Sequence, residues 1–280
     1  MFIDGLIILT EKMQVELLQK YLSKLWNIYS SDYGKIKKIV QSNNIEKIIK
    51  NIFLKSAFEK SDAETQYKML FEDNLIDIQN ETIESQIEYL QKYLLKLGKI
   101  NLNYSNYDKI KSIAQSAIIS KISKNVFFKS AFEIADSEYQ YKILFDDNLI
   151  DIQNETPESQ IEYLQKYLSN IRNISSSYEK IKLIVQSGRI SEKAKTFFIQ
   201  SVFEKVDAQT QYKILFDDNL IHIQNETPEN QIEYLQKYLL KLDSISSYNP
   251  DSNYYKIKLL AQTYKITENV TICTTKISKI

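Results

Sequence analysis

The chain has 280 residues, and its 36 basic residues balance 36 acidic ones, so its formal net charge is zero. Only two of the basic residues, Arg172 and Arg189, are arginines, whereas a surface that grips phosphates usually carries more of them. A neutral chain also lacks the general positive field that attracts nucleic acid or an anionic membrane surface. The composition therefore argues against nucleic acid and against a membrane as partners.

The chain begins with MFIDGLIILTEK, which has no basic leader and no small-residue cleavage pattern, so it predicts folded chain rather than a signal peptide. The sequence holds no run of eighteen or more apolar residues, which predicts no transmembrane segment. The single cysteine, Cys273, cannot form an internal disulfide and fits a reducing compartment. We expect a soluble protein that is cytoplasmic or delivered into a host cell.

Three stretches of the sequence are near copies of one another. Residues 140–168, QYKILFDDNLIDIQNETPESQIEYLQKYL, recur at residues 211–239 with two changes, and residues 66–94 hold a looser copy. Aligned on the motif Glu-x-x-Gln-Lys-Tyr, the copies advance by steps of 72, 74 and 71 residues. The glutamates of this motif are Glu16, Glu88, Glu162 and Glu233.

Repeats at a nearly constant period predict an array in which each repeat packs on its neighbours. We predict an all-α fold, an α-solenoid of about three and a half tandem repeats of roughly 72 residues, each made of two helical hairpins. One domain is expected over residues 1–280, with repeats at about 10–81, 82–155, 156–226 and 227–280, the last of them incomplete. The tetratricopeptide and ankyrin signatures are missing, so the likeness to helix-pair repeats concerns architecture only.

The first helix of a repeat is expected at about residues 84–97, where Ile87, Leu90, Leu94 and Leu97 recur at steps of three and four. A threonine precedes this helix in every repeat and is its expected N-cap. The four threonines are Thr10, Thr82, Thr156 and Thr227. In two repeats a proline follows at the first helical position, where the missing N–H group does no harm.

The other three helices of a repeat follow in order. The second begins near a tyrosine just before Lys-Ile-Lys; these tyrosines are Tyr33, Tyr107, Tyr178 and Tyr254. The third carries phenylalanines such as Phe127 and Phe132, which we expect in the core. The fourth begins at an aspartate cap; these caps are Asp62, Asp136 and Asp207. Residues 264–280 lack the phenylalanines and are interpreted as a terminal cap or an extended tail, with Cys273 a packed, inert thiol.

A residue that recurs in every repeat most simply serves the fold, and this argument weighs against catalysis. Neighbouring carboxylates recur and are interpreted as solvated helix ends rather than as a general acid and base. These pairs are Glu72 with Asp73, Asp146 with Asp147, and Asp217 with Asp218. His222, the single histidine, replaces Asp77 and Asp151 and is interpreted as a surface substitution. We expect no enzyme activity, no catalytic residue, no cofactor and no metal site.

Tyrosines form a second stripe on the first helices, beside the leucines. A tyrosine combines a large apolar ring with a polar tip, so two interpretations stay open: packing between repeats, or a ladder that holds an extended peptide or an amphipathic helix. This candidate protein-binding stripe comprises Tyr21, Tyr89, Tyr93, Tyr163, Tyr167, Tyr234 and Tyr238. Trp26, near one end of the array, is expected to cover core, with an interface hot spot as the alternative.

These observations together predict a non-enzymatic helical-repeat scaffold that binds a protein or a peptide. The AT-rich codon usage that the composition implies, together with the near-identical repeats, suggests a microbial or viral factor acting on host proteins. One alternative is a structural repeat protein that self-assembles end to end rather than staying monomeric. Another is a helical-repeat enzyme or nucleic-acid-binding protein, which the charge balance and the single histidine disfavour.

Overall fold

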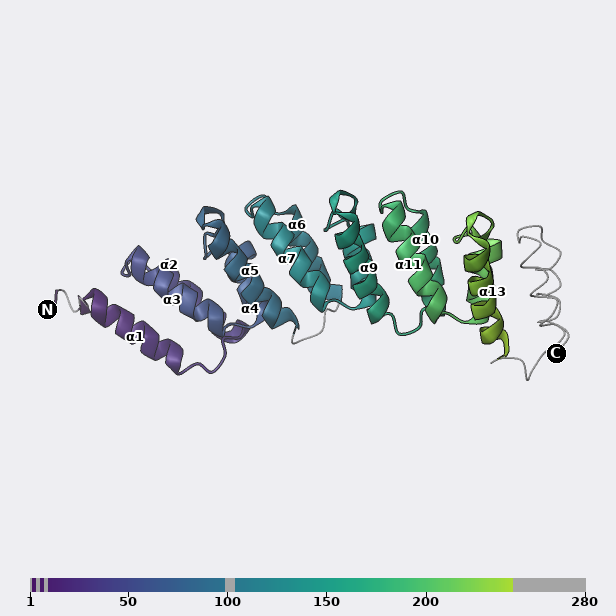
Figure 1. The fold of residues 1–280 in the computed structure, drawn as a ribbon. Coiled ribbons are helices and arrows are strands. Elements are labelled where there is room, and N and C mark those ends of the chain that lie inside the picture. Colours follow the sequence, from purple (N-terminus) through teal and green to yellow (C-terminus); the bar gives the residue numbers. More distant parts are fainter. Residues whose placement is uncertain (1, 4–5, 8–9, 99–103, 244–280) are drawn as a thin grey trace. The chain divides into compact units, whose positions relative to one another are not determined.

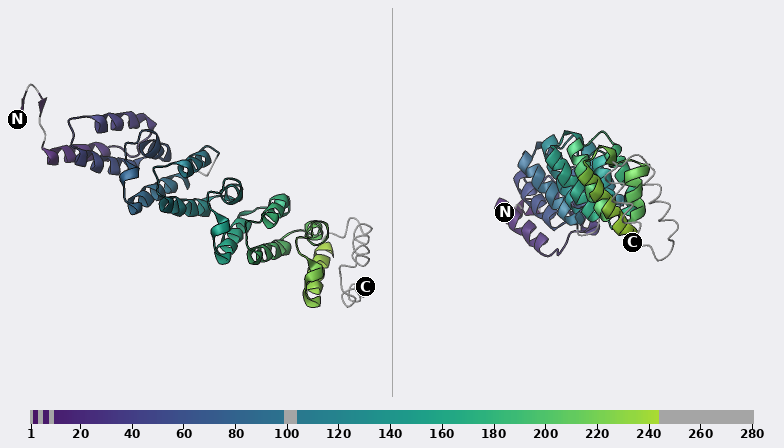
Figure 2. Two further views of the ribbon diagram at one scale, coloured as in Figure 1. Left: turned by 90° about the horizontal axis from the view of Figure 1, so that it is seen from above. Right: turned by 45° about the vertical axis from the view of Figure 1, so that its right-hand side comes forward.

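The computed structural model describes residues 2–3, 6–7, 10–98 and 104–243, and helices dominate it (Figure 1). Figure 2 follows the same helices from two further directions. The chain divides into two compact units, Met1–Ile150 and Asp151–Ile280, which are taken one at a time below. Tyr254, Cys273 and the cap or tail expected at residues 264–280 lie outside the described residues.

The first compact unit begins with two short antiparallel strands, β1 (Phe2–Ile3) and β2 (Leu6–Ile7). Its other described elements are helices. They are α1 (Glu11–Ser23), α2 (Ser30–Gln41), α3 (Lys47–Lys60), α4 (Ala63–Tyr67), the π-helix η1 (Lys68–Glu72), the 3-10 helix η2 (Ile78–Asn80), α5 (Ile83–Gly98), α6 (Tyr104–Gln115), α7 (Lys121–Ile134), α8 (Ser137–Tyr141) and the π-helix η3 (Lys142–Asp146).

The second compact unit repeats the order of the α-helices and π-helices of the first and adds a 3-10 helix, η5 (Ser175–Ser177), between the first and second helices of its repeat. Its elements are the 3-10 helix η4 (Ile152–Asn154), α9 (Pro157–Asn170), η5, α10 (Tyr178–Gln186), α11 (Glu192–Lys205), α12 (Ala208–Tyr212), the π-helix η6 (Lys213–Asp217), the 3-10 helix η7 (Ile223–Asn225) and α13 (Pro228–Asp243). The predicted all-α fold of tandem repeats with four helices each is confirmed.

Side-chain caps begin the helices where the sequence predicts them. Thr10, Thr82, Thr156 and Thr227 each accept a hydrogen bond from the backbone N–H three residues later, at 3.2 to 3.4 Å. Asp62, Asp136 and Asp207 cap the fourth helices in the same way, at 2.8 to 3.0 Å. Such caps satisfy N–H groups that have no partner within the helix and contribute about 1 kcal/mol each.

The fourth helix of each repeat has a feature that the sequence did not predict. After five residues it widens into the π-helices η1, η3 and η6. Each π-helix leads into an asparagine with positive φ, namely Asn74 (47°), Asn148 (52°) and Asn219 (52°). Asparagine tolerates this left-handed conformation better than most residues, so it allows the sharp turn back toward the next repeat.

Buried glutamines tie the first helix of a repeat to its third helix. In the first compact unit, Gln86 Nε2 donates to the carbonyl of Ile78 at 3.0 Å, and its Oε1 accepts from the N–H of Ser120, also at 3.0 Å. In the second, Gln160 binds the carbonyl of Ile152 and the N–H of Ser191, both at 2.8 Å. One amide thus satisfies two backbone groups and fixes the start of the third helix.

Candidate functional site

The tyrosine stripe lies mainly inside the protein. Tyr93, Tyr167 and Tyr238 are at most 1 % exposed, and burial raises the pKa of the hydroxyls of Tyr93 and Tyr238, which stay neutral. Tyr89 and Tyr234 are also buried, and they meet Phe58 and Phe203 edge to face, at 5.1 and 5.3 Å between ring centroids. Tyr21 and Tyr163 are half-buried. These positions favour packing between repeats over partner contact for most of the stripe.

The two members of each recurring carboxylate pair differ in their exposure and in their partners. The first members, Glu72, Asp146 and Asp217, are exposed, as predicted for a solvated helix end. The second members are half-buried. Each accepts a hydrogen bond from a tyrosine and forms an ion pair with a lysine. These clusters are Tyr33–Asp73–Lys37, Tyr107–Asp147–Lys111 and Tyr178–Asp218–Lys182, with tyrosine hydroxyl to carboxylate distances of 2.6, 2.7 and 2.7 Å.

Burial alone would raise the pKa of Asp218, but the hydrogen bonds from Lys182 and Tyr178 outweigh burial, and the pKa lies below the ordinary value of 3.8. Asp147 behaves in the same way with Lys111 and Tyr107. A carboxylate held in its charged form by two donors fastens the second helix of a repeat to the end of the π-helix. The interpretation of these second members as solvated is wrong, because each of them is engaged in the fold.

His222 is exposed, which agrees with its interpretation as a surface substitution. Its Nδ1 lies 3.0 Å from Asn219 Nδ2. The aspartates at this position in the other repeats, Asp77 and Asp151, instead accept a hydrogen bond from the asparagine three residues later, at 2.8 and 2.6 Å. The turn of the third repeat is therefore closed by a different set of side chains.

Trp26 is 93 % exposed. The expectation that it covers core is wrong, because so exposed a ring shields almost nothing beneath it. It follows α1 directly, and Tyr29, two residues beyond Asn27, is exposed as well. Asn27 Nδ2 donates to the Tyr29 hydroxyl at 3.2 Å, which orients that ring at the surface.

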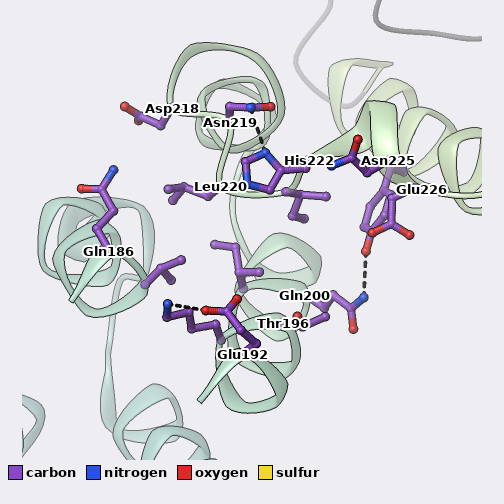
Figure 3. A pocket seen from close by; sticks show the side chains of 15 residues that line it. Gln186, Glu192, Thr196, Gln200, Asp218, Asn219, Leu220, His222, Asn225 and Glu226 are labelled. Atoms are coloured by element: carbon purple, nitrogen blue, oxygen red, sulfur yellow. Dashed lines mark hydrogen bonds and ion pairs between the residues drawn. The ribbon is translucent and has the colours of Figure 1, made fainter. Parts of the chain in front are cut away.

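A partly open hollow of about 580 Å³ lies in the second compact unit, lined by α10, α11, the turn at residues 218–222 and η7 of the third repeat and by α13 of the next one (Figure 3). We call it the hollow of the third repeat. Its apolar side chains include Val185, Ile199 and Ile221, which are buried. Its polar rim carries four primary amides and a hydroxyl, from Gln186, Gln200, Asn219, Asn225 and Thr196. Its charged side chains are Glu192, Lys195, Asp218 and Glu226, and His222 lies among them.

Hydrogen bonds hold several of these groups in place. Gln200 Nε2 donates to the Tyr234 hydroxyl at 2.9 Å, and Asn230 Nδ2 donates to Glu226 Oε2, also at 2.9 Å. Lys195 Nζ lies 2.7 Å from Glu192 Oε1, one helical turn away on α11. Burial, and to a smaller extent the charge of Glu226, raises the pKa of Tyr234, so its hydroxyl stays neutral beside the rim.

The sequence carries a signal for this hollow beyond His222. Glu192, Thr196 and Gln200 on α11 also depart from the residues of the other repeats. Their counterparts in the first two repeats are Lys47 and Lys121, Asn51 and Asn125, and Lys55 and Lys129. Residues that diverge between repeats thus gather around one hollow, although they lie up to thirty positions apart in the sequence.

In the part of the chain that the structure describes, no group of three or more histidine, cysteine, aspartate or glutamate side chains is placed to hold a metal ion. Nor is any of its helices long and apolar enough to cross a membrane. Comparisons of the chain with protein-family models, with curated proteins and with solved structures find no match.

Proposed function

We propose that the protein is a non-enzymatic helical-repeat scaffold that binds a protein or peptide through the hollow of the third repeat. The observation that carries the proposal is the composition of this hollow, a rim of primary amides around an aliphatic interior. An extended peptide presents N–H donors and C=O acceptors along its backbone. A primary amide offers both a donor and an acceptor, so such a rim suits a peptide of many sequences.

Two features favour binding over catalysis. The carboxylate of Asp218 is engaged by Tyr178 and Lys182, and its lowered pKa makes it a poor base near neutral pH. The same three-residue cluster recurs in the first two repeats, where a role in every fold unit explains it more simply than three active sites. His222 is exposed and contacts an amide rather than a nucleophile.

Site-specific photo-cross-linking tests the proposal. A benzophenone amino acid is placed at Gln186, on the rim of the hollow, in the full chain, which is then exposed to lysate of the source cell and irradiated. The matched control carries the same group at Leu183, which lies on the same helix, is 57 % exposed and does not line the hollow. We expect a specific adduct from position 186 and none from position 183. Equal labelling at both positions, or no adduct, contradicts the proposal.

A second candidate function, end-to-end self-assembly, is favoured by the first helix. Leu17 on α1 is the counterpart of Tyr89 on α5, which is only 8 % exposed because the preceding repeat packs on it through Phe58. Leu17 itself is 51 % exposed, and Met13 beside it is exposed as well. This apolar face of α1 occupies the position where another repeat would pack, so a second copy of the chain is its natural occupant.

Light scattering over a range of protein concentrations tests this second candidate. If the chain assembles through α1, the mass rises with concentration, and Leu17→Glu abolishes the rise. Leu95→Glu is the matched control, since Leu95 is also an exposed leucine but lies on α5. A constant monomer mass at all concentrations rejects self-assembly through this face.

A further inference from the structure

The hollow of the third repeat differs in charge from the matching positions of the first two repeats. Helix α11 has lost two lysines that α3 and α7 share: it carries Glu192 and Gln200 in their place. The lost residues correspond to Lys47 and Lys55 in α3 and to Lys121 and Lys129 in α7. Three carboxylates and one ammonium group now line the hollow, so its wall is negative when His222 is neutral.

Glu226 is the member of this set whose charge is not balanced. Lys195 pairs with Glu192, and Lys182 pairs with Asp218. Glu226 accepts a hydrogen bond from the neutral amide of Asn230, and within the described part of the chain no ion pair reaches it. A partly enclosed carboxylate without a cation attracts one from outside, because the hollow screens the attraction less than open water does.

Gln200 brings no cation to the surroundings of Glu226. Both side chains act on Tyr234: Gln200 Nε2 donates to its hydroxyl, and the charge of Glu226 reaches the same hydroxyl. Figure 3 shows Gln200 and Glu226 among the residues that line the hollow. Lysines stand at the position of Gln200 in the first two repeats, so a basic group that approaches Glu226 meets a neutral amide here instead of an ammonium group.

We infer that the hollow selects a basic side chain, lysine or arginine, from the peptide that the scaffold binds, with Glu226 as its counter-ion. The inference rests on the proposed function, since it assumes that a peptide occupies the hollow. Val185, Ile199 and Ile221 offer aliphatic surface for the methylene stem of such a side chain. In the first two repeats lysines occupy the positions of Glu192 and Gln200, so we expect a weaker selection of basic side chains there.

Selection from a random decapeptide phage library on the immobilised full chain tests this inference. With the natural chain, we expect lysine or arginine to be enriched at least tenfold at one position of the selected peptides. The test variant is Glu192→Lys with Gln200→Lys, which installs the residues of the first two repeats and is therefore compatible with the fold. We expect it to lose the enrichment. Glu226→Gln, which keeps the shape of the side chain, is expected to lose it as well.

The matched control is Lys193→Ile, which also installs the residue of the other two repeats on α11, outside the lining of the hollow. We expect it to retain the enrichment. Peptides that are selected without a basic preference, or a preference that survives in both hollow variants, overturn the inference and leave the scaffold proposal standing. If no peptide is selected by any of the proteins, the peptide-binding proposal itself fails.

Binding of one selected peptide then measures the contribution of the basic group directly. Replacing its lysine by norleucine, or its arginine by citrulline, removes the charge and nearly preserves the size. We expect the affinity of the natural chain to fall about tenfold or more, which corresponds to about 1.4 kcal/mol. Affinities that agree within twofold would exclude Glu226 as a counter-ion.

Discussion

The first helices of the repeats are nearly identical in sequence from repeat to repeat, whereas the wall of the third-repeat hollow is not. On the first helices the tyrosines and leucines recur almost unchanged, and the structure buries most of them. On the hollow wall, Glu192, Gln200 and His222 each depart from the residues of the other repeats, and none of them belongs to the buried core. Within this chain, residues that recur hold each repeat together, whereas residues that diverge gather around the hollow of the third repeat.

The largest effect on stability is expected at a recurring leucine of the first helices. Leu164, on α9, is completely buried, so Leu164→Ala removes apolar contacts and leaves a cavity. We expect the free energy of unfolding to fall by about 2 to 5 kcal/mol, measured by chemical denaturation. Leu183→Ala is the control, because Leu183 is mainly exposed and should change the value little. A loss below about 1 kcal/mol would show that the inner face of α9 is assigned wrongly.

The next effect concerns the recurring tyrosine, aspartate and lysine clusters. Asp218→Asn weakens the bonds from Tyr178 and Lys182, and we expect a loss of about 1 kcal/mol near neutral pH. Because the folded protein lowers the pKa of Asp218, this stabilisation is present above the ordinary value of 3.8 and is lost as the pH falls through the lower, folded value. The difference between natural chain and variant should therefore shrink in acid. A difference independent of pH would exclude the carboxylate charge as its cause.

A smaller effect, of opposite sign, is expected at the buried tyrosines. The hydroxyl of Tyr238 is buried and has no hydrogen-bond partner among the described residues. Tyr238→Phe removes this unsatisfied group and keeps the ring, so we expect a gain of up to about 1 kcal/mol in the free energy of unfolding. Thermal unfolding followed by circular dichroism measures it. Tyr178→Phe, which removes a hydroxyl that is bonded to Asp218, should destabilise the protein instead.

The smallest effect on stability is expected at His222, a residue that differs from its counterparts in the other repeats. His222→Asp restores the residue of the other repeats, where the aspartate accepts a hydrogen bond from the asparagine three residues later. The side chain is exposed, so we expect the melting temperature to stay unchanged within the error of the measurement. A clear loss of stability would mean that His222 is integrated into the fold of its repeat.

Much of the fold could be predicted from the sequence because its signals are local. The apolar stripe of α5, the threonine and aspartate caps and the first-turn prolines of α9 and α13 all depend on residues within a few positions of each other. The π-helices could not be predicted in this way. Their residues have an ordinary helical pattern. The aspartate that follows each π-helix, Asp73, Asp147 or Asp218, is bonded to a tyrosine forty positions earlier in the chain, a contact that a local pattern does not encode.

The candidate site was harder to predict for the same reason. The tyrosine stripe was open to two interpretations, since tyrosine suits both a core and a surface, and only the packing of Phe58 on Tyr89 and of Phe203 on Tyr234 favours one of them. The hollow combines Gln186, Gln200 and Glu226 from separate elements. Their proximity depends on how the helices pack, which a pattern along the chain does not encode.

The exposure of Trp26 also has a spectroscopic consequence. The chain has a single tryptophan, so its selectively excited fluorescence reports on the segment that follows α1 and on no other place in the molecule. A ring in contact with water emits at long wavelength and is quenched readily by iodide. A peptide that fills the hollow beside His222, which belongs to the other compact unit, should leave this emission unchanged. Association through the first repeat should shift the emission to the blue and protect the ring from the quencher, so the natural chain carries its own label for telling these two events apart.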